Sequence, residues 1–187
     1  MSVERLRQEI DALGDAEWTG WPHAYGTARD TADHLSALAG TDAAAQFAAA
    51  RHYSSAIVHQ SSVWPASPDA FDWLVRVLRV APLSANVLDE CLGALAEAAE
   101  YLGDIETGTP VPELSRAARA WLAKFAVTPD DDHELLWDVD ETVGEEVYQW
   151  VLIRLAALRP AVARLVTELA EQAPQACGRV REAWSTE

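Results

Sequence analysis

Lysine and cysteine are scarce in this sequence, and each scarcity excludes a class of protein. Lys124 is the one lysine among 187 residues, and the formal net charge is −16. Direct binding to nucleic acid usually needs a basic surface that releases phosphate counterions, so the charge argues against a nucleic-acid partner. Cys91 and Cys177 provide neither a disulfide framework nor a metal-ligand spacing, and both are expected to be small buried side chains.

Long apolar runs are also missing. The longest run, residues 147–158, contains Gln149 and Arg154 and is too short to span a bilayer. Residues 1–14 carry charged side chains instead of the apolar centre of a signal peptide. We therefore expect no membrane segment and a cytoplasmic location.

No catalytic, phosphate-binding or metal-binding motif is recognisable. The sequence contains no GxSxG, GxxxxGK[ST], GxGxxG, HExxH or CxxC pattern. His52 and His59 are two helical turns apart if both lie on one helix, a distance of about 10 Å that is too long to share a metal ion. We expect a non-catalytic protein with no cofactor, no metal site and no small-molecule substrate.

Hydrophobic periodicity predicts helices along the whole chain. Half of the residues are hydrophobic, which is enough for a packed core. Apolar side chains recur at helical spacing, and no segment alternates with a period of two. The expected fold class is therefore all-α, without strands. Helix starts are expected at Ser2, Asp30 or Thr31, Asp42, Ser67 with Pro68, Ser84, Pro112 and Thr142, which opens a capping box with Glu145; Pro160 either starts a helix or kinks the preceding one.

Two helix ends can be predicted more closely. Gly14 is expected to end the first helix. The helix that starts at Asp42 is expected to run to about His59, with Phe47 on its apolar face. Residues 59–68 then end this helix, turn the chain and start the next helix, because proline cannot continue a helix and also restricts the residue before it.

The spacing of the helices favours a repeat-built fold. The shorter helices of successive pairs are expected to begin near residues 31, 68 and 112, close to the period of HEAT and armadillo arrays. Such an array of antiparallel helix pairs forms an α–α superhelix with one continuous core; an irregular helical bundle is the alternative. We expect a single domain over 1–187, with 1–30 as an N-terminal cap, 31–126 as helix pairs, and 127–187 as an acidic connection followed by C-terminal helices.

Three segments resemble a known group of proteins. They are Tyr25-Gly26-Thr27-Ala28-Arg29-Asp30-Thr31, then His59-Gln60-Ser61-Ser62-Val63-Trp64-Pro65-Ala66-Ser67, then Phe71-Asp72-Trp73-Leu74. Together they resemble bacterial HEAT-like helical-repeat proteins over about residues 21–100. Ser61 and Trp64 stand where that group would have Gly and Tyr. The resemblance implies an α-solenoid-like fold and a binding role, and the analogy of fold and charge extends to immunity proteins that neutralise a toxin.

The acidic connection is the first candidate binding surface. Its carboxylates have no Lys or Arg between them and surround a tryptophan, which suits a basic protein partner. The alternative is a solvated acidic loop whose tryptophan packs into the core. The candidate residues are Asp130, Asp131, Asp132, Glu134, Trp137, Asp138, Asp140 and Glu141.

Aromatic side chains form a second candidate surface. Trp18, Trp21 and Tyr25 lie in an expected loop over residues 15–28, and Trp64 lies in the connection before the helix at residue 68. Rigid aromatic side chains on loops are good contact residues. The alternative for the loop is a cap folded over the first repeat.

These patterns favour an acidic, immunity-like inhibitor of a basic protein. One alternative is a helical-repeat enzyme or nucleic-acid processor similar to DNA glycosylases, and another is a plain scaffolding domain. The nucleic-acid alternative requires one contiguous basic groove. Its arginines would be Arg51, Arg76, Arg79, Arg116 and Arg119.

Overall fold

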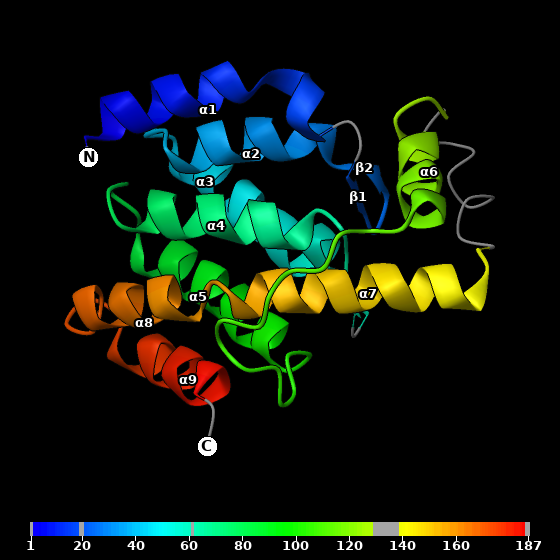
Figure 1. Ribbon diagram of the computed structural model, residues 1–187. Helices are drawn as coiled ribbons and strands as arrows, with labels where there is room; N and C mark the ends of the chain where they lie inside the picture. The colour runs from blue at the N-terminus through cyan, green and yellow to red at the C-terminus, as the bar shows by residue number, and fades with distance from the viewer. Residues whose placement is uncertain (1, 19–20, 61, 129–138, 186–187) are drawn as a thin grey trace.

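Helices dominate the computed structural model, which describes residues 2–18, 21–60, 62–128 and 139–185 (Figure 1). The helices are α1 (Val3–Trp18), α2 (Thr31–Leu38), α3 (Ala43–His52), α4 (Ser67–Leu78), α5 (Ala85–Ala99), α6 (Arg116–Phe125), α7 (Glu141–Ala156), α8 (Arg159–Glu168) and α9 (Pro174–Trp184). A 3₁₀ turn (Ala28–Asp30) precedes α2, and a π-helical segment (Tyr53–Ile57) follows α3. The mainly helical expectation is therefore confirmed.

The expectation of no strands is wrong. Strands β1 (Pro22–His23) and β2 (Gly26–Thr27) pair antiparallel, and so do β3 (Val58–His59) and β4 (Ser62–Val63). Each strand has two residues, too few to show the alternation that identifies a strand in a sequence. Both hairpins lie against helices rather than in a larger sheet, and Ala24 N–H donates to Ala56 C=O to join the first hairpin to the π-helical segment.

The helices pack in two rows (Figure 1). Helix α4 lies between α2 and α8 in one row, and α5 lies between α3 and α9 in the other. Contacts between α2 and α3, α4 and α5, and α8 and α9 join the rows, while α1 covers α2 at one end. Helix α7 runs along α4, and α6 packs on α7. The helix that was expected near residue 112, as the start of a third pair, begins at Arg116 as α6. It packs on α7 and not in either of the two rows.

The core between the rows is built mainly from large apolar side chains. Tyr53, Phe71 and Leu95 have no exposed surface. The Tyr53 hydroxyl donates to Ala70 C=O at 3.3 Å, and Trp184 Nε1–H donates to Leu95 C=O at 2.7 Å. These bonds satisfy buried polar groups, so the core fixes the helices that carry the functional side chains.

Two predicted helix ends are wrong. Helix α1 continues through Gly14 to Trp18. Helix α3 ends at His52, because the chain widens into the π-helical segment and then enters β3. Phe47 is 42% exposed rather than packed on the apolar face. Buried Ala49 and Ala50 provide that face instead, since their small side chains allow close approach.

Capping predictions are partly confirmed. Asp42 accepts hydrogen bonds from two backbone amides, and Ser84 accepts one from Val87. Ser67 does not cap α4, because its hydroxyl instead accepts from Trp64 N–H and donates to Ile57 C=O. The expected capping box at Thr142 is also wrong, since Asp140 begins α7 by accepting from Thr142 N–H. Pro160 lies in the first turn of α8, so it starts a helix.

Candidate functional site

Half of the predicted partner-binding residues lie outside the described part of the chain. Two that are described, Asp140 and Glu141, are exposed at the start of α7. Trp18 ends α1, but its side chain also lies outside the described atoms. The acidic connection therefore stays a prediction for all but its last two residues. The residues outside the description are Asp130, Asp131, Asp132, Glu134, Trp137 and Asp138.

Two of the predicted aromatic residues have structural contacts. The half-buried Trp21 ring stacks on Trp150 of α7, with centroids 5.2 Å apart and an interplanar angle of 24°. Trp64 is half-buried next to the Ser67 hydroxyl, which binds its backbone amide. The Trp21 ring therefore helps to hold the start of β1 against α7.

Tyr25 is the predicted aromatic residue that faces solvent. It lies at the tip of the β1–β2 hairpin and is 61% exposed. Its hydroxyl lies 3.3 Å from His59 Nδ1, and the two ring centroids are 5.0 Å apart. The tips of the two hairpins therefore meet, so His59 belongs to the same surface as Tyr25.

From His59 this surface continues across the end of α5. His59 lies close enough to Glu97 to oppose the rise in its pKa, which burial and then the neighbouring Glu100 cause. Tyr101 follows Glu100 in the sequence and lies near Tyr148 of α7. The pKa of Tyr148 is raised by burial and then by Tyr101 and Glu145. We call this surface the acidic tyrosine strip: Tyr25, His59, Glu97, Glu100, Tyr101, Glu145 and Tyr148.

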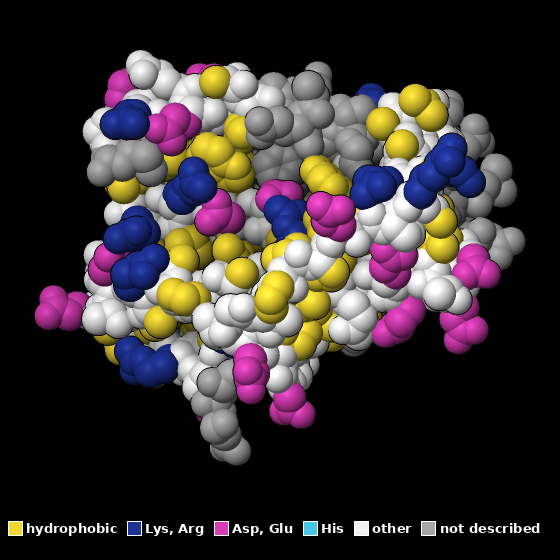
Figure 2. All heavy atoms as spheres, in the orientation of Figure 1, with side chains coloured by type: hydrophobic (Ala, Val, Ile, Leu, Met, Phe, Trp, Pro, Cys, Tyr) yellow, Lys and Arg dark blue, Asp and Glu magenta, His cyan; other side chains and the backbone are white. Residues whose placement is uncertain are grey.

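An open hollow of about 830 Å³ adjoins the strip at Glu100. Asp104 and Glu106 also line it, together with small or neutral residues, and none of the described residues that line it is Lys or Arg. None of the ion pairs among the described residues involves a carboxylate of the strip or of this hollow. Acidic side chains likewise gather along the lower edge of the molecule in Figure 2, below α7.

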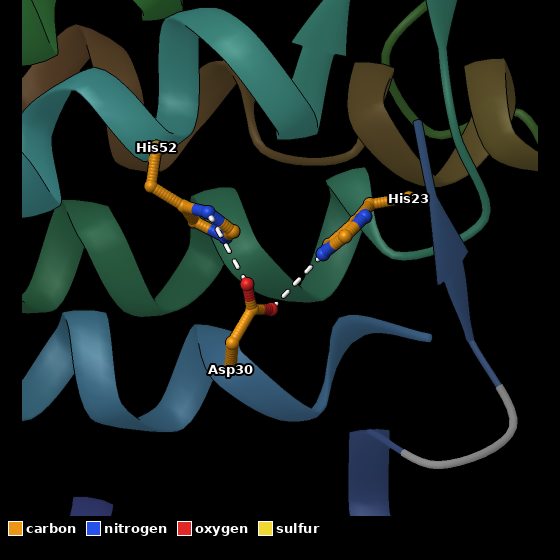
Figure 3. Close-up of side chains that lie close together, drawn as sticks. All are labelled: His23, Asp30 and His52. Carbon is orange, nitrogen blue, oxygen red and sulfur yellow. Dashed lines mark hydrogen bonds and ion pairs between the residues drawn. The ribbon is translucent and has the colours of Figure 1, made fainter. Parts of the chain in front are cut away.

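A histidine–aspartate cluster that was not predicted joins β1 to α2 and α3. It consists of His23 from β1, Asp30 from the 3₁₀ turn before α2, His34 from α2, and His52 from the end of α3; Figure 3 shows His23, Asp30 and His52. His23 and His52 are almost fully buried, whereas the Asp30 side chain is 53% exposed. The cluster therefore places one accessible carboxylate among three imidazoles.

The tautomer of His23 follows from its hydrogen bonds. Tyr25 N–H donates to His23 Nδ1 at 3.1 Å, so that nitrogen carries the lone pair. The proton of the neutral ring is then on Nε2, which donates to Asp30 Oδ1 at 2.9 Å. His23 thus connects the exposed tip of the hairpin to the carboxylate and holds Asp30 in one orientation.

His34 and His52 stack beside the same carboxylate. Their ring centroids are 4.1 Å apart with an interplanar angle of 23°. His52 Nε2 lies 3.1 Å from the buried Thr31 hydroxyl, while His52 Nδ1 and His34 Nε2 lie 3.8 Å and 3.9 Å from Asp30 Oδ2. Both of the latter distances are too long for a hydrogen bond.

Electrostatics keep these imidazoles neutral and the carboxylate ionised. Burial, and then the neighbouring His34, lower the pKa of His52 to about 3. Burial also lowers the pKa of His34, against the opposing effect of Asp30. Burial raises the pKa of Asp30, but the His23 hydrogen bond and the surrounding histidines outweigh it, so the pKa is lowered. Neutral imidazole and carboxylate are the forms that bind metal ions.

The sequence contained one signal for this cluster. Asp30 and His34 are four residues apart, a spacing that puts both on one face of a helix. Their partners His23 and His52 come from other segments. The helix that was predicted to extend to His59 paired His52 with His59 and not with Asp30. Among the described residues, His23, Asp30 and His52 offer ligand atoms that all lie within 4.8 Å of one another, as a metal site requires.

The arginines of the nucleic-acid alternative lie on α3, α4 and α6, except Arg79, which directly follows α4. Arg76 pairs with Asp72 at 2.6 Å, and Arg79 forms two contacts with Glu168, so both charges are locally balanced. These ion pairs give the alternative no support.

The surroundings of the two thiols favour their protonated forms. Burial raises the pKa of Cys91 to about 12 and also raises the pKa of Cys177. Both side chains are buried, as expected, and a protonated thiol is a poor nucleophile.

Among the described helices, none has the length and apolar character needed to cross a bilayer. No protein-family model, curated protein or solved structure matches this chain at a significant level.

Proposed function

We propose that the protein is a non-catalytic binding protein that captures a basic protein on the acidic tyrosine strip and the adjoining hollow. The observation that carries this proposal is the uncompensated charge of Glu97, Glu100, Asp104 and Glu106. Glu97 and Glu100 repel each other, which contributes to the raised pKa of Glu97. A cationic side chain placed between them would relieve this repulsion, and the negative field would speed its approach.

The tyrosines give the strip a second property of protein-binding surfaces. Tyrosine provides a large, rigid contact area with a polar end, and it is enriched at interfaces. Tyr25 is 61% exposed, while Tyr101 and Tyr148 are half-buried between the carboxylates. Arginine side chains also stack favourably on aromatic rings, so the combination suits an arginine-bearing partner.

We propose that the acidic connection, which precedes α7 in the sequence, belongs to the same partner site. Residues 130–138 lead directly into α7, whose first turns carry Glu141 and Glu145. We therefore keep the whole acidic connection in the proposed partner site.

We also propose that α2–α3, α4–α5 and α8–α9 are the pairs of a short HEAT-like array, with α1 as its N-terminal cap. Support comes from the two rows of packed helices and from the contacts within each pair. In this arrangement the hairpins, α6 and α7 are additions to the array, and they carry Tyr25, His59, Glu145 and Tyr148 of the strip.

The specific form that we propose is an inhibitor of the immunity type, which would cover the active surface of a basic, toxic enzyme. Co-expression with the product of a neighbouring gene tests this form directly. Rescue of growth by the wild-type protein, but not by a variant with a neutralised strip, is the expected result. Equal rescue by both proteins would show that the strip is not the inhibitory surface.

The binding role itself is tested with a peptide rich in arginine and lysine, using isothermal titration calorimetry at two salt concentrations. The variant E97Q/E100Q/E145Q should bind it at least about tenfold more weakly than wild type. The control E4Q/E113Q/E182Q has the same net charge but keeps the strip, so it should bind like wild type. An equal loss of peptide affinity in both variants would mean that only the net charge matters. It would refute the acidic tyrosine strip as the binding surface. Binding to duplex DNA at low salt, with no binding to the peptide, would instead favour the nucleic-acid alternative.

A further inference from the structure

We propose that the groove between α8 and α9 binds a small apolar carboxylate, such as a medium-chain fatty acid or an aromatic acid, through the guanidinium of Arg159. These two helices carry no residue of the acidic tyrosine strip, so the site can be tested independently of the protein partner proposed above. The sequence predicted no small-molecule ligand, because the residues of this groove come from two helices and form no recognisable motif.

Helices α8 and α9 lie side by side and enclose an open groove of about 260 Å³ (Figure 1 shows the two helices). Ligand pockets for drug-sized molecules have volumes of about 300–1,000 Å³, so this groove suits a smaller ligand. Arg159 and Thr167, eight residues apart on α8, both line it, which gives it a length of about 12 Å along that helix. Its floor consists of buried apolar side chains: Val162, Val166, Val180 and Trp184.

Arg159 is the buried charged residue of this groove, with 8% of its surface exposed. Its Nη1 donates to Ile105 C=O, in the segment after α5. Its Nε has no hydrogen-bond partner among the described residues, and none of their ion pairs involves Arg159. A buried cation without a counter-charge is unfavourable, so a carboxylate placed in the groove would offset that cost.

The unused edge of the Arg159 guanidinium is the one that binds carboxylates. With Nη1 bonded to Ile105, the groups left are Nε and Nη2. Arg79 uses these same two atoms to bind Glu168, at 2.8 Å and 2.6 Å. Two parallel charge-assisted bonds of this kind fix the orientation of the carboxylate. Because Arg159 Nε is covered by neighbouring atoms, we expect the guanidinium to turn slightly toward the groove when the ligand binds.

The surroundings of Arg159 do not supply the missing negative charge. Arg159 is the first residue of α8, where the helix dipole favours anions, and the first turn of α8 carries no acidic residue. Burial lowers the pKa of Arg159, and no described carboxylate opposes this shift. Arg181 lines the exposed rim and likewise belongs to none of the ion pairs among the described residues. A chain with a net charge of −16 thus has a local preference for an anion here.

Calorimetric titration of the full chain with octanoate, octanol and octylammonium tests this site. We expect one octanoate per chain, with octanol and octylammonium binding at least about tenfold more weakly. Non-specific uptake by apolar surface would give the opposite order for the two ions, because the net charge attracts the cation. The indole N–H signal of Trp184, assigned in nitrogen-15 spectra with the variant W184F, should shift when octanoate binds.

Three variants locate the binding surface. R159Q should weaken octanoate binding by at least about tenfold and change octanol binding little, because it removes the charge and keeps the apolar floor. A163W places a large ring at the exposed rim and should weaken both ligands. R164Q removes the same charge from the same helix at a residue outside the groove, so it should bind octanoate like wild type.

The exposed position of Ala163 keeps the test valid if a change at buried Arg159 disturbs folding, which circular dichroism would reveal. No octanoate binding by the folded wild type at millimolar concentration would overturn the proposal. Wild-type octanoate affinity in both R159Q and A163W would overturn it as well, since the ligand would then bind elsewhere. Tighter binding of an apolar peptide with a free C-terminal carboxylate than of octanoate would assign the groove to a protein partner instead of a small molecule.

Discussion

Arg154 and Asp69 form a two-contact ion pair that joins α7 to α4. Arg154 Nη2 lies 2.6 Å from Asp69 Oδ1, and Nη1 lies 3.2 Å from Oδ2. The same guanidinium lies 4.5 Å from the centre of the Trp150 ring, which in turn stacks on Trp21. These contacts connect α4, α7 and the residue before β1, so they fix the helix that carries Tyr148 against the rest of the molecule.

Removal of this ion pair should destabilise the protein. D69N keeps the size of the side chain but leaves a partly buried guanidinium with a weakened partner, and we expect a loss of about 1–3 kcal/mol in the free energy of unfolding. Urea unfolding measures it. The matched control is D72N, which breaks the more exposed Asp72–Arg76 pair within α4 and should cost at most about 0.5 kcal/mol. Equal effects of both variants would contradict the structural role of the Arg154–Asp69 pair.

The Ser67 hydroxyl should contribute more than a helix cap does. It is fully buried, accepts from Trp64 N–H at 2.8 Å and donates to Ile57 C=O at 2.6 Å. S67A leaves both groups without their partner and should cost about 2–4 kcal/mol. S84A removes an exposed cap and should cost about 1 kcal/mol. Thermal or urea unfolding compares the two variants, and a cost for S67A no larger than that for S84A would show that these groups find other partners.

Gln60 at the turn of the β3–β4 hairpin has a backbone φ of 47°, in the left-handed region. A non-glycine residue is strained there, so Q60G should raise the free energy of unfolding by up to about 1 kcal/mol. Q149G, at an exposed position inside α7, should lower it by about 1 kcal/mol. Thermal unfolding of both variants checks the prediction. A destabilised Q60G would mean that contacts of the Gln60 side chain outweigh the backbone strain.

Acid should destabilise the folded chain through the histidine cluster. The pKa of His52 is about 3 in the folded chain and about 6.5 when unfolded. The unfolded chain therefore binds a proton below about pH 6.5 that the folded chain does not bind, so stability falls as the pH falls from 6.5 toward 3. The loss is at most about 1.4 kcal/mol per pH unit from this residue, and His34 acts in the same direction.

Urea unfolding across this pH range measures the effect in wild type and in H52Q. The variant lacks the titrating ring, so its stability should depend less steeply on pH even if it is lower at neutral pH. H59Q, which leaves the cluster intact, should keep the wild-type slope. Identical slopes in wild type and H52Q would show that His52 is not held neutral in the folded chain.

Local patterns in the sequence predicted the features that depend on neighbouring residues. The caps at Asp42 and Ser84 bond backbone amides two or three residues away, and the structure confirms them. The role of Ser67 was missed because its partner Ile57 lies ten residues earlier and across a hairpin. The hairpins themselves are too short to leave a periodic signal.

The candidate sites depend on contacts between distant segments. Tyr25 was predicted, but His59 joins it only because α3 ends at His52 and the chain turns into β3. Asp30 and His34 share a recognisable spacing, whereas His23 and His52 reach them from other segments. Such clusters become visible once the packing of α2 against α3 is known.

The π-helical segment Tyr53–Ile57 has a consequence for how this chain tolerates changes in length. A residue lost from it would turn the following hairpin by about 100° relative to α3, because successive residues of a helix differ by that angle. His59 would then leave Tyr25, while His52 kept its place beside Asp30. Natural relatives that retain both contacts should therefore conserve the number of residues between His52 and His59 more strictly than the identity of most residues within it.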